Sequence, residues 1–223
     1  PEAYHAKVAR GAQEDGARVA SIHDRVIFKQ QGLEQRLQYD RDLRKSLVDR
    51  FFDPQVDPQA IERDEALERG DFASGGYAAK VRRSARRIQV QLRREGNAWG
   101  IPLTLTKGVT LEAGSSTLEI AYLLEGLPRD RSLHFGVEFN LAGLPAGAED
   151  RYFHRLDGQL LGQLQTRLDL ENVNDLCLTD RWQGIELRWT VNRPTSLWTF
   201  PIESVSQSEG GFEAVHQSVA LLP

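Results

Sequence analysis

The stretch "RRIQVQLRREGNAWGIPLTLTKGVTL" (residues 86–111) decides the fold. Ile88, Val90 and Leu92 alternate with glutamine and arginine in its first part, and "IPLTLTKGVTL" (101–111) repeats the alternation after a turn. Successive side chains of a strand point to opposite faces, so a period of two predicts strands with one buried face. The stretch therefore predicts two strands of a sheet.

The same alternation recurs along the chain beyond residue 71. We expect further strands over 116–126, 132–141, 183–192, 196–206 and 212–222, and earlier ones over 17–29 and 32–40. The stretch 43–52 is ambiguous, because its apolar spacing also suits a helix. A parallel sheet would need a helix between successive strands, for which there is no room. The pattern predicts an all-β fold, an antiparallel sandwich in which each sheet buries one face.

One short surface helix is expected near residues 58–69. Asp57 can accept the free amide protons at the start of this helix. Pro58 suits the first helical position, where its missing N–H has no partner anyway. Gly70 can take the left-handed conformation that ends a helix. The apolar stripe is thin, which indicates a surface connection.

Composition excludes several classes of protein. The 223 residues are 40% hydrophobic and 27% charged, which excludes bulk disorder, and there is no apolar run long enough to span a membrane. A net charge of −4 gives no general field for nucleic acid. Cys177 is the single cysteine, so no internal disulfide forms. We therefore expect a reducing, cytoplasmic location and neither nucleic acid nor membrane as a partner.

Recognisable catalytic motifs are absent from the sequence. It has no G-x-S-x-G, S-x-x-K, Walker or H-E-x-x-H pattern, and its five histidines are scattered. The acidic stretch "DLENVNDLCLTD" (169–180) has oxygen ligands that suit calcium, but aspartate and asparagine are also turn residues, and we favour a turn. The basic stretch 80–95 indicates a solvated or ion-paired strand. We predict no catalytic residue, no metal and no cofactor in this chain.

Tryptophans are the one feature that points to sugars. Trp99 and Trp182 adjoin turns and are candidates for exposed positions, whereas Trp189 and Trp198 lie in expected strands and suit a core. Sugar rings stack on flat indole faces through their apolar C–H surfaces. Trp99 and Trp182 are therefore candidate carbohydrate contacts.

Three stretches in order carry a family resemblance. They lie within 4–52, over 134–143 ("HFGVEFNLAG") and over 175–223, where "LWTFPIESVSQSEGGFE" (197–213) is the most telling. Together they resemble the C-terminal β-sandwich domain of glycoside hydrolase family 57 enzymes, of the α-amylase and 4-α-glucanotransferase type.

The resemblance implies a fold like the galactose mutarotase super-sandwich and a retaining, α-glucan-active enzyme. In that family the two catalytic carboxylates lie in an N-terminal (β/α) barrel, which does not resemble anything in this chain. We therefore expect residues 1–13 to be the remnant of a linker or helix from a missing catalytic barrel, and 14–223 to be a single β-sandwich domain. Alone, this chain should be inactive. Its expected role is a non-catalytic C-terminal domain that packs on the barrel and contacts glucan or maltooligosaccharide.

Polar residues inside the family-like stretches are candidate contacts to sugar or to the barrel, although ion pairs and turn hydrogen bonds are their simpler role. These candidates are His23, Asp24, Asp40, Arg41, Glu138, Asn140, Gln207 and Glu209. Glu209 would lie about 20 Å from Glu203 on an extended strand, too far for a retaining pair of carboxylates. The glycines that follow it predict a hairpin or bulge instead.

Two other functions stay open. The tryptophans allow a stand-alone carbohydrate-binding module. The mutarotase-type fold allows a sugar epimerase, which would need a histidine acid and a carboxylate base in one cleft. His134 with Glu138, or His216 with Glu209, are the pairs to consider.

Overall fold

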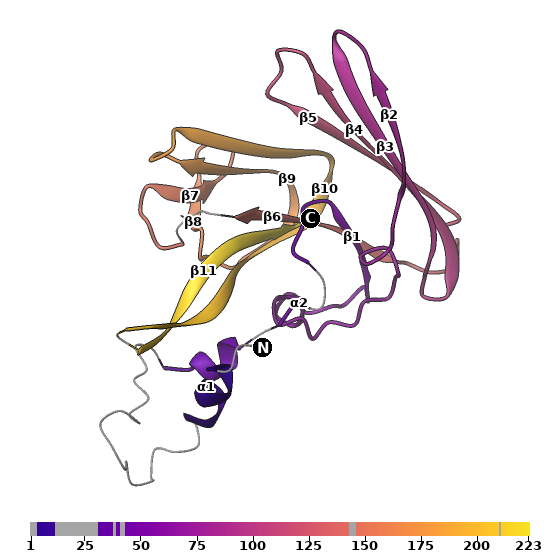
Figure 1. Ribbon diagram of the computed structural model, residues 1–223. Coiled ribbons are helices and arrows are strands. Elements are labelled where there is room, and N and C mark those ends of the chain that lie inside the picture. The colour runs from indigo at the N-terminus through magenta and orange to yellow at the C-terminus, as the bar shows by residue number, and fades with distance from the viewer. Residues whose placement is uncertain (1–3, 12–30, 38, 41–42, 143–145, 210) are drawn as a thin grey trace, which may run out of the picture. The chain divides into compact units, whose positions relative to one another are not determined.

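The computed structural model describes residues 4–11, 31–37, 39–40, 43–142, 146–209 and 211–223. Figure 1 shows the arrangement of strands, which dominate this part of the chain. The helices are α1 (His5–Gly11), the 3₁₀ helix η2 (Leu33–Arg36) and α2 (Pro58–Glu62). The strands are β1 (Val48–Phe52), β2 (Ala78–Arg83), β3 (Arg87–Ala98), β4 (Ile101–Glu112), β5 (Leu118–Glu125), β6 (His134–Ala142), β7 (Arg151–His154), β8 (Leu160–Gln163), β9 (Leu168–Asp180), β10 (Ile185–Ser208) and β11 (Gly211–Leu222).

These strands form two sheets. The seven-stranded sheet has the order β1-β6-β11-β10-β9-β7-β8, and the four-stranded sheet has the order β2-β3-β4-β5. The pairs β9–β10, β10–β11 and β3–β4 are antiparallel, as are the other pairs with a described register. The predicted all-β antiparallel class is confirmed. The likeness to a mutarotase super-sandwich stays a prediction.

The chain divides into two compact units. Unit 1 comprises Pro1–Ser46, Pro58–Glu65 and Glu138–Pro223, and unit 2 comprises Leu47–Asp57 and Ala66–Val137. The expected division into a remnant over 1–13 and one sandwich domain over 14–223 stays a prediction.

Unit 1 is built around the long strand β10. Its first half pairs with β9 and its second half with β11, and the register with β9 shifts between Thr190 and Thr195. Pro194 lies in this irregular segment, where its missing N–H costs no ladder hydrogen bond. The main core joins Phe153, Leu164, Leu168, Val173, Leu176, Leu178, Leu197, Val219 and Leu221. A smaller cluster packs α1 and η2 onto the β10–β11 hairpin through Val8, Leu33, Val205 and Phe212.

Unit 2 contains the four-stranded meander β2–β5. Trp99 and Gly100 join β3 to β4 as a two-residue turn, with φ of 57° and 73°. Positive φ at both central residues is the mark of a type I′ hairpin, whose twist matches that of the strands. The core packs Phe51 and Phe72 against Ala98, Leu103 and Leu105. It therefore occupies the end of the sheet next to this turn.

The helix near 58–69 is shorter than the sequence predicts. It ends after Glu62, because Asp64 takes a positive φ of 53°. The N–H of Glu65 then donates to the carbonyl of Ala60 (2.8 Å), and the N–H of Asp64 donates to Ile61 (3.1 Å). These two bonds are a Schellman motif, which satisfies the last carbonyls of a helix. The prediction that Gly70 ends the helix is wrong.

Gly70 instead forms an isolated bridge to Ala98. A Cβ at position 70 would lie 2.9 Å from Cδ2 of Phe51, a buried core residue, so packing requires glycine here. The glycine thus serves the core of unit 2 and not a helix end.

Two further expectations concern the first quarter of the chain. The strand expected over 32–40 is wrong in its described residues, since Leu33–Arg36 form a 3₁₀ helix. The ambiguous stretch 43–52 contains the strand Val48–Phe52. The strand expected over 17–29 lies outside the described residues. In the described ranges no helix is long and apolar enough to cross a membrane.

Candidate functional site

Glu138 and Asn140 lie in a polar network on β6. The carboxylate of Glu138 is only 2% exposed, and its Oε1 accepts hydrogen bonds from Arg44 Nη1 (3.1 Å) and Asn140 Nδ2 (2.8 Å). Arg44 also donates to Asp40 Oδ1 through Nε (2.8 Å). Burial acts to lower the pKa of Arg44, but the bonds and charges of Asp40 and Glu138 outweigh burial and raise it. Arg44 therefore stays a cation between two carboxylates.

Asn140 fastens the segment before β1 to β6. The side-chain Nδ2 of Asn140 donates to the carbonyl of Lys45 (2.9 Å). Ser46 Oγ donates to the backbone carbonyl of Asn140 (3.1 Å) and accepts from the backbone N–H of Asn140 (3.0 Å). Asp40, Glu138 and Asn140 thus come together, in the loop-fixing arrangement that sequence allows. A contact of these residues with sugar or barrel stays a prediction.

The remaining polar candidates do not join this network in the described structure. Gln207 and Glu209 are exposed at the tip of the β10–β11 hairpin, where Ser208 pairs with Gly211. His23, Asp24 and Arg41 lie outside the described residues. Glu209 therefore occupies a turn, as its neighbouring glycines predict.

The four tryptophans have different environments, and Trp189 is partly buried against the main core of unit 1. Trp182, in the β9–β10 turn, is 79% exposed. Trp99 is half-buried, and the guanidinium of Arg69 lies over its ring at 4.6 Å, so it is less exposed than its turn position suggests. Trp198 is buried, and its Nε1 donates to Asp169 (2.7 Å). Among them Trp182 presents the open indole face that a sugar would need.

The acidic stretch 169–180 is neither a calcium loop nor a turn. It forms strand β9, and its carboxylates have separate partners: Asp169 binds Trp198, Asp175 binds Arg155, and Asp180 binds Arg151. Among the residues that the structure describes, no group of three His, Cys, Asp or Glu side chains is placed to hold a metal ion. The turn that we favoured is wrong because the Leu and Val residues of this segment are buried in the main core of unit 1 as a strand.

The histidine–carboxylate pairs of the epimerase hypothesis do not gain support. Register places Glu203, and not Glu209, opposite His216. His134 and Glu138 both lie on β6, four residues apart, which is about 13 Å along a strand. Glu138 is moreover engaged by Arg44.

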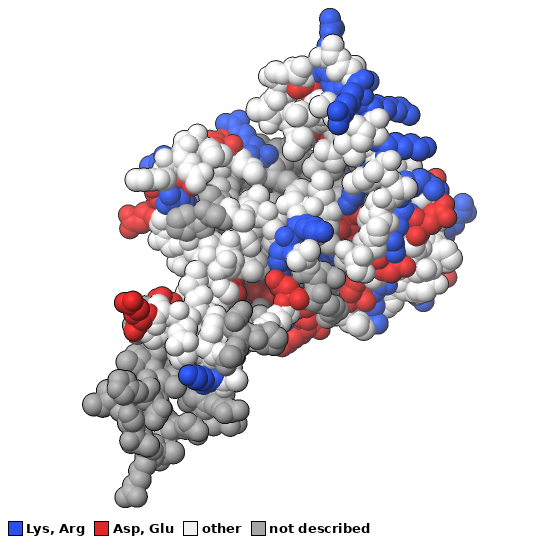
Figure 2. Space-filling view, in the orientation of Figure 1, with Lys and Arg blue, Asp and Glu red and all other residues white. Residues whose placement is uncertain are grey.

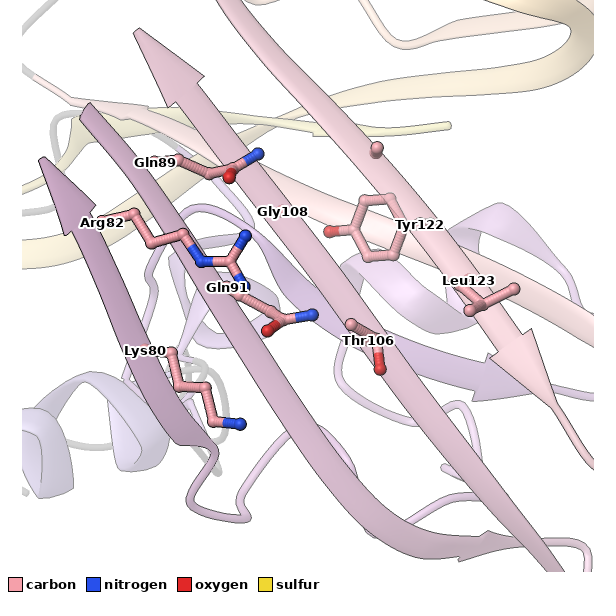
Figure 3. Close-up of a pocket in the computed structure, with 9 residues that line it drawn as sticks. Lys80, Arg82, Gln89, Gln91, Thr106, Gly108, Tyr122 and Leu123 are labelled. Carbon is pink, nitrogen blue, oxygen red and sulfur yellow. The ribbon is translucent and has the colours of Figure 1, made fainter. Parts of the chain in front are cut away.

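The four-stranded sheet of unit 2 carries a polar hollow that was not predicted from the sequence. Figure 3 shows Lys80, Arg82, Gln89 and Gln91 leaning from β2 and β3 toward β4, where Gly108 leaves a gap. The hollow has a volume of about 290 Å³. Thr106, Ala121, Tyr122 and Leu123 complete its lining. A glycine in the middle of an alternating strand is the signal that could have pointed to it.

The pairing register explains why these residues meet. Lys80 pairs with Gln91, Gln91 with Gly108, and Gly108 with Ala121, so one row crosses all four strands. Residues two apart on a strand share a face, which adds Arg82 beside Lys80. The two cations therefore lie at the β2 end of this row. At its other end Gly108 and Ala121 have side chains too small to fill the space above the sheet.

Comparisons with known proteins place the whole chain in one family. A family model described as "Alpha-amylase/4-alpha-glucanotransferase, C-terminal" matches residues 1–223. α-Amylase 1 of Dictyoglomus thermophilum is 31% identical over 230 residues, covering 99% of this chain and 31% of that protein. The 4-α-glucanotransferase of Thermococcus kodakarensis is 27% identical, covering 98% and 30%.

A solved structure supports the same assignment. The crystal structure of 4-α-glucanotransferase from Thermococcus litoralis matches with a TM-score of 0.69 and 25% identity, over 92% of this chain and 29% of that one. The chain spans about a third of the length of the curated relatives that it matches. The resemblance found in the sequence is confirmed: the chain belongs to the family of α-amylase/4-α-glucanotransferase C-terminal domains.

Proposed function

We propose that the chain acts as the non-catalytic C-terminal domain of an α-1,4-glucan-processing hydrolase or transferase. One observation carries the proposal: a family model described as C-terminal matches all 223 residues, while the relatives are about three times as long. The bond-breaking groups of such an enzyme would then belong to the other two thirds of the polypeptide. The β-sheets would serve as a scaffold that packs on this catalytic portion.

Local chemistry supports a scaffold. Glu138, a buried carboxylate of the family-like stretches, is tied to Arg44 and Asn140, so it is not poised to meet a substrate. Glu209 is exposed at a hairpin tip and has no histidine opposite it in the register. Cys177 is 1% exposed, and burial raises the pKa of its thiol, which makes it a poor nucleophile. A single cysteine, which leaves no internal disulfide, also suits the proposed cytoplasmic location.

The proposal is tested by reading the coding sequence upstream of the codon for Pro1. We expect the reading frame to continue for about twice the present length and to match the N-terminal portions of the relatives. An in-frame stop codon directly upstream of the codon for Pro1, with no coding sequence for a matching N-terminal portion, would contradict the proposal.

Carbohydrate binding by this domain is the second candidate. The observation that favours it is Trp182, which is 79% exposed on a β-turn. Titration with maltoheptaose, followed by tryptophan fluorescence, should give a saturable change that Trp182→Ala abolishes and Trp198→Phe preserves. The absence of any change at millimolar sugar would exclude this role.

A further inference from the structure

We propose that the hollow on the four-stranded sheet binds an oxyanion of the phosphate class. None of its lining residues belongs to the family-like stretches of the sequence, so the proposal does not depend on the function proposed above. Lys80, Arg82, Gln89, Gln91 and Thr106 supply its polar side chains, and no carboxylate lines it.

The two cations of the hollow are not engaged elsewhere in the described structure, whereas Gln89 Nε2 donates to Thr110 Oγ1 (3.3 Å). Neither Lys80 nor Arg82 forms an ion pair or side-chain hydrogen bond with another residue of the described ranges, whereas Arg93 on the same face is paired with Glu95 at 2.8 Å. An ammonium offers three N–H donors and a guanidinium offers five, with no acceptor. Hydrogen bonds from such cations to an oxyanion are among the strongest in proteins. The site therefore favours an anion over a neutral sugar.

The stretch of chain that carries Lys80 and Arg82 is rich in cations, although Glu119 on β5 shares their face of the sheet. Figure 2 shows basic side chains gathered over the part of the molecule where Figure 1 labels β2 and β3. The stretch 80–87 carries Lys80, Arg82, Arg83, Arg86 and Arg87, although the whole chain has a net charge of −4. A local concentration of one sign steers ligands of the opposite sign to the surface.

Gly108 keeps the hollow open without being required by the fold. Its φ is not positive, and a Cβ built there meets no atom within 4 Å. A glycine inside a strand costs stability relative to residues that prefer strands. Any larger side chain would project from the same face as Gln91, into the hollow. We infer that ligand access explains this glycine.

Amide chemical shifts of the labelled 223-residue chain test the proposal. The probes are inorganic phosphate, glucose 6-phosphate and, as the neutral comparison, maltoheptaose. We expect saturable shifts at Gly108, Gln89 and Gln91 with both phosphates, and none there with maltoheptaose. Stronger binding of glucose 6-phosphate would identify a phosphate ester as the ligand, and equal binding would identify the free ion.

Three variants locate the effect. Arg82→Met should weaken phosphate binding about tenfold to a hundredfold, the range for a lost hydrogen bond between charged groups. Gly108→Val should abolish binding while the fold is kept or stabilised, because valine suits a strand. Arg83→Met is the matched control: it removes the same charge one residue away, from the opposite face of β2, and should change affinity less than about twofold.

Three outcomes would overturn the proposal. Shifts with maltoheptaose alone would mean a neutral-sugar site. Equal losses in Arg82→Met and Arg83→Met would mean diffuse attraction without a site. The absence of saturable shifts at Gly108 with either phosphate would mean that the hollow does not bind oxyanions.

Discussion

The buried ion pair of unit 2 gives the sharpest stability prediction. The side chains of Lys107 and Asp49 are 5% and 0% exposed. Lys107 Nζ donates to Asp49 Oδ2 (2.7 Å) and to the carbonyl of Leu47 (2.6 Å), and Tyr77 donates its hydroxyl to the same carboxylate oxygen (2.5 Å). Burial, together with the neighbouring Asp49, raises the pKa of Tyr77, so the phenol stays a donor. Asp49 therefore depends on Lys107 for its only counter-charge within hydrogen-bonding reach in the described structure.

The perturbation is Lys107→Met, which keeps most of the length of the side chain and removes its charge. At 2.7 Å the Coulomb attraction of the pair is roughly 6 kcal/mol, taking an effective dielectric constant of about 20. Desolvation of the lysine offsets part of this attraction. Leaving a buried charge without its partner costs about 3–5 kcal/mol. We expect the free energy of unfolding to fall by that amount.

Urea unfolding, followed by tryptophan fluorescence, measures the loss. With an m-value of about 2 kcal/mol per M, the midpoint should fall by about 1.5–2.5 M. Arg93→Met is the control on the same sheet. Its ion pair with Glu95 is 52% and 71% exposed, and exposed pairs contribute less than about 1 kcal/mol.

A double variant separates the ion pair from simple packing. Adding Asp49→Asn to Lys107→Met removes the unpaired charge. The double variant should therefore lose less free energy of unfolding than the sum of the losses in the two single variants. The reasoning fails if Lys107→Met costs no more than Arg93→Met. It also fails if the losses at positions 107 and 49 are additive.

Three further predictions use the same unfolding measurement. Arg44→Met should cost about 3 kcal/mol, since it removes a cation that is paired with the 2% exposed Glu138; a loss under about 1 kcal/mol would contradict the network. The hydrogen bonds from its arginine partner hold the pKa of Asp175 below its ordinary 3.8, so its stabilisation exists above about pH 4 and is lost at lower pH. Asp175→Asn should therefore lose less stability than the parent on acidification below about pH 4, and parallel curves would refute this. Burial lowers the pKa values of His216 and His134 from 6.5, so protonation of these histidines in the unfolded chain erodes stability as pH falls through 6.5. His216→Leu should reduce this slope, and an unchanged slope would refute it.

Alternation along the chain predicted the sheets well, because it is a local property of each strand. Residues 86–111 were expected to form two strands and form β3 and β4. The runs over 183–192 and 196–206 are joined in one strand, β10, since Pro194 lies in an irregular segment that still continues the sheet. Periodicity fixes neither the exact ends of strands nor which neighbours they pair with.

Features that depend on distant partners were not predictable. A helix was expected over 58–69, but the positive φ of Asp64 ends it after Glu62. Gly70 is required by its close packing on Phe51 and not by a helix end. The segment Leu33–Arg36 alternates like a strand, yet it is a 3₁₀ helix whose Leu33 packs with Val205. Tertiary packing outweighs local propensity at such places.

The candidate sites show the same limit. Glu138 and Asn140 were identified from family-like stretches, whereas their partner Arg44 was not, because the contact spans 94 residues of sequence. The hollow beside Gly108 appears only when the register aligns β2, β3 and β4. A single sequence does not specify that register.

The central claim is that this chain is a β scaffold and that bond cleavage belongs to another part of the enzyme. Incubation of the purified 223-residue chain with maltoheptaose, with product analysis for hydrolysis and glucosyl transfer, tests it most directly. The account predicts no product above the rate of a heat-denatured sample. Sustained turnover that survives repurification and disappears in a Glu209→Gln or Glu138→Gln variant would contradict it.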